Sequence, residues 1–165
     1  MLNLKEVIAH ARRPYMSGID RSADRVNASH EFFTPTDMLI KINDWLDSYD
    51  ESLFTVSTKK FLDHSCGDGQ ILTEVLIRKL ESLGKEEITD INFEQALSTI
   101  YGVELMIDNV DLCRERLLCG SQNPKHIAIV EQNIYQENGL EFSYEFRPMS
   151  NTRRTREERA RKKVK

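Results

Sequence analysis

The sequence predicts an α/β domain with a mainly parallel sheet, because short apolar runs alternate with stretches of helical periodicity. Runs of strand length cover residues 59–63, 99–105 and 127–132. Helical patterns over 70–83 and 108–118 separate them, and this alternation is typical of parallel strands joined by crossover helices. A looser alternation over 140–146 suits a fourth strand or an extended edge. We therefore expect three or four mainly parallel strands with flanking helices.

The amino-terminal part carries one clear helical signal. An amphipathic pattern covers residues 2–13, and Pro14 ends it because proline cannot continue a helix. The polar stretch 15–29 suits a loop or a second short helix. The expected organisation is an N-terminal helical extension over 1–30, an α/β domain over 31–148 and a basic flexible tail over 149–165.

A further helix is expected after Thr34, since Thr34 or Thr36 can cap it. Its predicted inward-facing stripe consists of Met38, Leu39, Ile42, Trp45 and Leu46. Residues 48–57 are expected to form a loop and 92–98 a short helix. Gly84 is expected to close the helix over 70–83, as a glycine past a helix end commonly does.

Charge is distributed unevenly along the 165 residues. The formal net charge is -4, so the chain as a whole is not a polyanion binder. Residues 151–165 hold eight Lys/Arg and two Asp/Glu, a local balance of +6 that leaves -10 for the other residues. Such a tail either only solubilises the chain or contacts DNA or another acidic surface. The candidates for nucleic-acid contact are Arg153, Arg154, Arg156, Arg159, Arg161, Lys162 and Lys163.

Cysteine usage and hydropathy predict a cytoplasmic protein. The chain has an odd number of cysteines, Cys66, Cys113 and Cys119, and their spacing is not that of a zinc site. We therefore expect free thiols in a reducing compartment and no metal. The amino-terminal residues lack the apolar core of a signal peptide. No run approaches the roughly 18 apolar residues of a membrane span, so no membrane partner is expected.

The segment Asp63 to Gly69 follows the first predicted strand, where open α/β sheets bind ligands. Gly67 and Gly69 permit positive φ and close backbone approach, and the next helix directs free N–H groups at the same space. Asp63 can pair with a cationic group, such as the ammonium of a bound amino acid. Together with Asp68 it would repel a phosphate, and the spacing is neither a GxGxxG dinucleotide loop nor a P-loop.

Polar side chains also end the next two apolar runs. Glu104 can accept hydrogen bonds from both hydroxyls of a ribose, as an acid after the second strand of a nucleotide-binding βαβ unit does. Gln132 and Asn133 end the third run, where an amide can read an adenine edge. The alternatives remain that Glu104 is a solvated strand-end acid and that the glycine segment is a plain strand–helix turn.

Four segments carry a family resemblance: EFFTPTDML, FLDHSCGDGQIL, IYGVELMIDNVDLCRERL and IVEQNIY. In this order and spacing they resemble the first motif, the cofactor motif, the ribose-acid motif and the adenine-contacting segment of the γ-type N6-adenine DNA methyltransferases, which include type I modification subunits. The resemblance covers about residues 27–135 and corresponds to the amino-terminal half of such an enzyme. The chain also looks like short methylase-like proteins of tailed phages.

The resemblance implies a truncated Rossmann-like methyltransferase fold that binds S-adenosyl-L-methionine. Phe33 and Thr34 would contact the methionine end of the cofactor, and Asp63 would hold its amino group. Glu104 would bind the ribose and Asn133 would meet the adenine. The implied cofactor-binding set is completed by Ser65, Cys66, Gly67, Gly69 and Leu105.

The chain departs from this family in its chemistry. His64 replaces the usual proline of the cofactor motif, and Asn133 replaces the usual Asp. The Asp/Asn-Pro-Pro-Tyr/Phe motif that holds the flipped target base is absent, so no catalytic residue is expected. The resemblance therefore implies a cofactor-binding, DNA adenine methyltransferase-like chain that a partner chain completes. The alternative is a degenerate fold that serves as a non-enzymatic binding module for DNA or a host protein.

Overall fold

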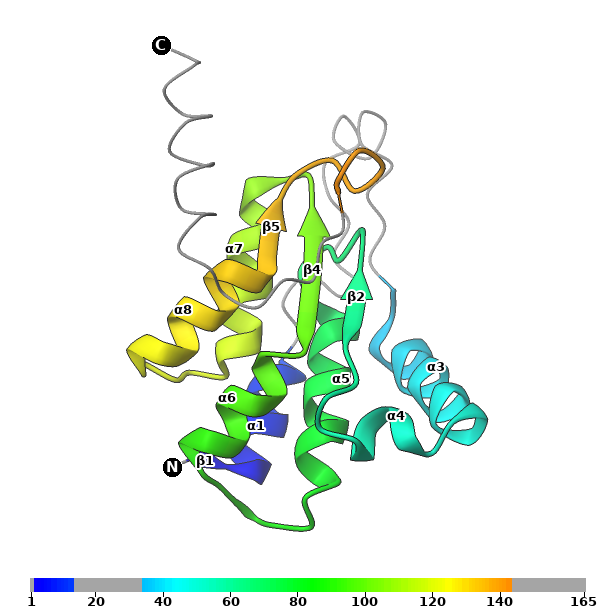
Figure 1. Ribbon diagram of the computed structural model, residues 1–165, viewed down its shortest axis with the longest axis vertical. Coiled ribbons are helices and arrows are strands. Elements are labelled where there is room, and N and C mark those ends of the chain that lie inside the picture. The colour runs from blue at the N-terminus through cyan, green and yellow to red at the C-terminus, as the bar shows by residue number, and fades with distance from the viewer. Residues whose placement is uncertain (1, 14–33, 144–165) are drawn as a thin grey trace.

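A computed structural model describes residues 2–13 and 34–143 as a mixed α/β structure (Figure 1). Its main sheet has three parallel strands in the order β2-β4-β5. These strands are β2 (Phe61–Asp63), β4 (Ile100–Glu104) and β5 (Ile134–Gln136). The predicted parallel α/β architecture with flanking helices is thereby confirmed. The expected segment 15–29 and the tail after residue 148 lie outside the described residues.

Helices α1, α3, α5, α6 and α7 lie close to where the sequence predicts them, whereas α4 and α8 were not predicted. The structure has α1 (Leu4–Ala11), α3 (Thr36–Tyr49), α4 (Ser52–Thr55), α5 (Gln70–Glu81), α6 (Asp90–Leu97), α7 (Ile107–Leu118) and α8 (Pro124–Asn133). Local capping explains several starts: the Thr89 hydroxyl accepts from the Asn92 amide at the start of α6, at 3.2 Å. The crossover from β2 to β4 includes α5 and α6, and the crossover from β4 to β5 includes α7 and α8.

The amino-terminal residues are part of the same folded core. Strand β1 (Leu2–Asn3) pairs antiparallel with β3 (Glu87–Ile88), and α1 packs against α5 and α7. Val7 is fully buried, and Ala11 is 2% exposed. The expected helix over 2–13 is thus confirmed for Leu4–Ala11, while the proposed domain boundary at residue 30 stays a prediction.

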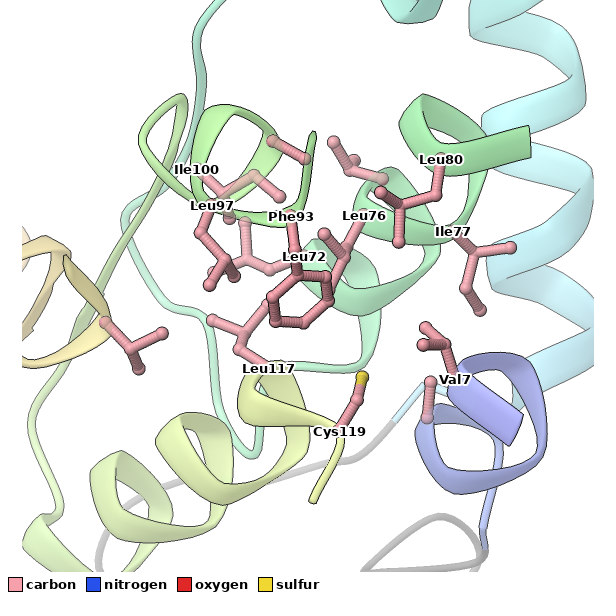
Figure 2. Close-up of a cluster of buried hydrophobic side chains, with 14 of the residues drawn as sticks. Val7, Leu72, Leu76, Ile77, Leu80, Phe93, Leu97, Ile100, Leu117 and Cys119 are labelled. Carbon is pink, nitrogen blue, oxygen red and sulfur yellow. The ribbon is translucent and has the colours of Figure 1, made fainter. Parts of the chain in front are cut away.

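A single cluster of apolar side chains joins the helices to the sheet (Figure 2). The labelled members come from α1, α5, α6, β4 and the end of α7: Val7, Leu72, Leu76, Ile77, Leu80, Phe93, Leu97, Ile100, Leu117 and Cys119. Each large buried side chain contributes roughly 1.5–3 kcal/mol of burial free energy. Because α5 supplies much of this cluster, the turn that leads from β2 into α5 is held firmly.

The expected strand over 127–132 is wrong, because these residues belong to helix α8. Asn123 caps α8 by accepting from the Lys125 amide at 3.0 Å, and Pro124 occupies the first helical position. The buried residues His126 and Val130 are four apart and share one helix face. A short apolar run fits either a strand or a buried helix, and the Asn-Pro start decides for the helix.

Two further expectations need correction. Residues 138–141 form a turn in which the Glu141 amide donates to the Asn138 carbonyl, so the fourth strand over 140–146 is wrong for its described part. Leu140 is 90% exposed. The loop expected over 48–57 contains the short helix α4. Of the predicted α3 stripe, Leu39 is buried, while Met38, Ile42 and Trp45 face solvent.

Candidate functional site

The carboxyl ends of the three parallel strands bring polar side chains to one edge of the sheet, the upper edge in Figure 1. Asp63 ends β2, Glu104 ends β4 and Gln136 ends β5. In the ladder Asp63 lies opposite Gly102, and Glu104 lies opposite Gln136. Ligands of open α/β sheets bind beyond this edge. The structure therefore brings together the two acids that the sequence singles out.

The loop between β2 and α5 is tied to β4 by its backbone. The Cys66 amide donates to the Val103 carbonyl at 3.0 Å, and the Gly67 amide donates to Glu104 Oε2 at 3.0 Å. Gly67 has φ 52° and Gly69 has φ 84°, a left-handed region that favours glycine. Gly69 is the N-cap of α5, directly before the first helical residue Gln70. Both predicted glycines are thus required by the turn that shapes this loop.

Glu104 connects the loop to the start of α7. Its Oε1 accepts from the Met106 amide at 2.9 Å and from Asn109 Nδ2 at 3.5 Å, while Oε2 accepts from Gly67. The residue is 8% exposed, so its orientation is set by these contacts and not by solvent. A carboxylate oxygen can accept two hydrogen bonds, so Oε2 retains capacity for a hydroxyl donor.

Asp63 is a partly buried acid at the mouth of the loop. Its Oδ1 accepts from the backbone amide of Ser65 at 3.0 Å, and the Ser65 residue itself is exposed. Burial raises the pKa of Asp63, and the Ser65 hydrogen bond and the nearby His64 oppose that rise only in part. A carboxylate held in an unfavourable environment is typical of binding and catalytic sites.

We expect Asp63→Asn to stabilise the fold near neutral pH. Because the folded-state pKa lies above the ordinary value of 3.8, the wild-type chain loses stability as the pH rises through the window between them. Asparagine keeps an acceptor for the Ser65 amide but carries no charge. Thermal unfolding at pH 7 should show a higher Tm for the variant than for the wild type.

The stabilising difference should vanish below pH 3.8, where folded and unfolded Asp63 are both protonated. Glu131→Gln, which removes an exposed carboxylate, is the matched control and should leave Tm nearly unchanged at both pH values. A Tm gain for Asp63→Asn of equal size at pH 3 and pH 7 would contradict this account.

The second acid of the loop, Asp68, plays a different part from the one expected. Its Oδ2 accepts from Arg116 Nη2 at 2.6 Å, and the two side chains are 2% and 3% exposed. Arg116 also donates to the Ala11 carbonyl at 3.2 Å. Asp68 therefore anchors the loop to α7 and, through Arg116, to α1. Because Arg116 compensates its charge, Asp68 does not repel a ligand. The sequence did not reveal the role of Arg116, because its partner Asp68 lies far from it in the chain and no local pattern links the two residues.

The cysteine of the loop is a packing residue. Cys66 is buried with its Sγ 3.9 Å from Cys113 Sγ, and this contact together with burial raises its pKa well above the ordinary value. Burial also raises the pKa of Cys119 to about 12. All three thiols are free and buried. A thiol with a raised pKa is a poor nucleophile, so Cys66 contributes shape to the loop and not covalent chemistry.

The start of α3 reaches the start of α5. Thr36 Oγ1 donates to Gln70 Oε1 at 3.4 Å, and Thr34, two residues earlier, is partly buried. Gln70 is 7% exposed, and its Nε2 has no hydrogen-bond partner within the described residues. Thr36 and Gln70 line a small pocket together with Ala11, Arg12, Leu39, Glu74 and Arg116. Thr36, which directly follows the Thr-Pro pair, thus contacts Gln70, which directly follows Gly69.

Apolar and amide groups flank the acids. Leu105, a predicted site residue, is 59% exposed directly after β4, and Ile107 is 50% exposed. Asn133 does not reach this edge, because it ends α8 and its amide donates to the Leu97 carbonyl at 3.0 Å. Gln136 occupies the strand end instead, with its amide 3.5 Å from the Leu105 carbonyl. Sequence reasoning missed it because IVEQ was taken for the strand.

Two groups of predicted site residues lie outside the described residues. They are Phe33 and the cations of the tail, Arg153, Arg154, Arg156, Arg159, Arg161, Lys162 and Lys163. Within residues 2–13 and 34–143, no helix is long and apolar enough to cross a lipid bilayer. Comparison of the chain with protein-family models, curated proteins and solved structures finds no significant match.

Proposed function

We propose that this chain binds S-adenosyl-L-methionine and is the cofactor-binding half of an N6-adenine DNA methyltransferase-like protein. One observation carries the proposal: Asp63 and Glu104 end neighbouring parallel strands, and Glu104 accepts a hydrogen bond from the two-glycine loop that follows Asp63. A carboxylate pair around a backbone-lined loop suits a ligand with an ammonium and a ribose better than one with phosphates.

The donor set fits the cofactor group by group. Asp63 would pair with the ammonium of the methionine end, and the free capacity of Glu104 Oε2 would accept from a ribose hydroxyl. The exposed side chains of Leu105 and Ile107 would cover an adenine face. Gln136, at the end of β5, supplies an amide for the adenine edge. The bound cofactor would supply an electrophilic methyl group.

Gln70 Nε2, which has no hydrogen-bond partner within residues 2–13 and 34–143, supports a polar ligand near the start of α5. A buried side-chain donor without a partner costs about 1–3 kcal/mol, so a water or ligand acceptor there would be stabilising. Thr36 lies at the same place and presents its hydroxyl to Gln70. The sequence lacks the Asn/Asp-Pro-Pro-Tyr motif that holds a flipped base, so we propose that methyl transfer needs a partner chain that carries this motif, and DNA.

Calorimetric titration of the purified chain with S-adenosyl-L-methionine tests this function. We expect saturable binding that Asp63→Asn and Glu104→Gln each weaken about tenfold or more, a loss of about 1.4 kcal/mol or more per variant. Glu131→Gln should bind like the wild type. Asp63→Asn is the more informative variant, because we expect it to raise Tm. A loss of binding by a variant with a higher Tm cannot be attributed to unfolding.

Two outcomes would count against the proposal. Binding by Asp63→Asn equal to that of the wild type would remove the acid from the site. An absence of heat at millimolar cofactor would favour the alternative, a degenerate fold that serves as a non-enzymatic module for DNA or a protein. With labelled cofactor and DNA, the chain by itself should transfer no methyl group, whereas a complementary chain should restore transfer.

A further inference from the structure

The segment that follows β5 crosses the carboxyl edge of the sheet and reaches the loop that follows β2. The Glu137 amide donates to the Glu104 carbonyl at 3.0 Å, which fixes the segment at the end of β4. Gly139 then lies against the backbone of His64, the residue that directly follows β2. This is the orange segment above β4 and β2 in Figure 1. We call residues 137–142 the strap, because they connect the strand ends at which the two acids of the candidate site lie.

The approach of the strap to the loop depends on glycine. A Cβ atom added at Gly139 would collide with the His64 carbonyl oxygen and would lie 3.1 Å from the His64 carbonyl carbon. Both are backbone atoms, so no side-chain rotation can relieve the collision. The φ angle of Gly139 lies outside the left-handed region. The contact therefore requires the absence of a side chain and not an unusual backbone conformation.

The strap buries little side-chain surface in this position. None of the side chains of residues 137–143 is buried, and Leu140 is 90% exposed. The partly buried ring of Phe142 lies 4.7 Å from the ring of Tyr135. A segment of this kind opens at a lower free-energy cost than the core does. The turn inside the strap has its own hydrogen bond, from the Leu140 amide to Asn138 Oδ1 at 3.1 Å, so it can move as a unit.

The two acids of the candidate site are covered in this structure. Glu104 is 8% exposed, and Asp63 is only partly exposed. A ligand that contacts both carboxylates therefore needs an element at this edge to move. The glycine loop is poorly suited to move, because the buried pair of Asp68 with Arg116 fixes it to α7. The strap, which buries none of its side chains, is well suited.

We propose that the strap is a gate: docked on His64 it closes the carboxyl edge of the sheet, and it lifts to admit a ligand to Asp63 and Glu104. The identity of this ligand, S-adenosyl-L-methionine, rests on the proposed function, whereas the closure does not. If only the lifted state binds, the apparent dissociation constant is the intrinsic constant divided by the fraction of lifted chains. A substitution that lifts the strap should therefore speed association and tighten binding.

Chemical labelling of Asp63 tests the closure without any ligand. A water-soluble carbodiimide and an amine convert accessible carboxyl groups to amides, and peptide mass spectrometry gives the rate at each residue. We expect Gly139→Ala to label at Asp63 at least about threefold faster than the wild type, because the added Cβ is incompatible with the docked strap. Leu140→Ala changes an outward side chain of the same strap and should label like the wild type. The exposed Glu131 should label equally in all three chains.

Stopped-flow binding of S-adenosyl-L-methionine tests the gate itself. Gly139→Ala should raise the association rate constant at least about threefold, and Phe142→Ala, which removes the ring contact with Tyr135, should act in the same direction. If no chain binds the cofactor but Gly139→Ala exposes Asp63, the proposed function fails and the closure stands. Equal labelling of Asp63 in the wild type and Gly139→Ala would overturn the gate. Faster labelling accompanied by cofactor binding at the wild-type rate would also overturn it.

Discussion

Replacing Asp68 by alanine is expected to lower the free energy of unfolding by about 3–5 kcal/mol. The carboxylate lies 2.6 Å from Arg116 Nη2, and both side chains are almost completely buried. Removing one partner of such a pair leaves a buried charge without its compensation, which is the costly case. Urea denaturation followed by circular dichroism measures the change.

The double variant Asp68→Ala/Arg116→Met sharpens this prediction. Because it removes both charges, it should be less destabilised than the sum of the two single variants, with a coupling of about 1–3 kcal/mol. Glu86→Ala is the control: its pair with Lys5 is 3.8 Å long and about 80% exposed, so it should cost at most about 1 kcal/mol. An Asp68→Ala variant no less stable than Glu86→Ala would show that the pair does not anchor the loop.

Gly69→Ala is expected to destabilise the chain by about 2–5 kcal/mol, from two separable causes. The backbone at Gly69 has φ +84°, which strains any L side chain. In addition, a Cβ atom there would lie 2.6 Å from Cys113 Sγ and 3.1 Å from Cys113 Cα. The backbone contact cannot be relieved by turning a side chain, so α7 and the glycine loop would have to separate.

Gly84→Ala isolates the first cause. Its φ is also positive, at +63°. Within residues 2–13 and 34–143, however, no heavy atom outside its own chain neighbours lies within 4 Å of the added Cβ. It should therefore cost only about 1–2 kcal/mol. The difference between the two variants in denaturant unfolding measures the contact with α7. If both variants lose the same stability, close packing of the loop on Cys113 is not what requires glycine at position 69.

Local patterns sufficed for the elements whose signals lie within one stretch of chain. Periodicity and Gly84 predicted α5, and the apolar run before Glu104 predicted β4 with its acid at the strand end. The two loop glycines were found for the same reason, since positive φ in a strand-to-helix turn is a local demand. The binding role given to these residues stays a prediction.

Local patterns could not decide between helix and strand for short apolar segments. The run at Ile127 belongs to α8, and the actual strand is the three-residue segment Ile134–Gln136 that begins where α8 ends, with no turn residue between them. Three residues are too few for a period to be read. The amide at the carboxyl end of the third strand is therefore that of Gln136 and not the predicted Asn133.

The sequence by itself determined the α/β alternation, the glycine turn and the acids that end β2 and β4. Only the tertiary structure decided the direction in which each side chain points. It turned Asp68 toward Arg116, 48 positions away, brought Thr36 to Gln70, and left the predicted inner residues Met38 and Trp45 in solvent. The physical reason is that helical and strand periods specify which residues share a face, whereas the partner of each face depends on elements distant in the chain.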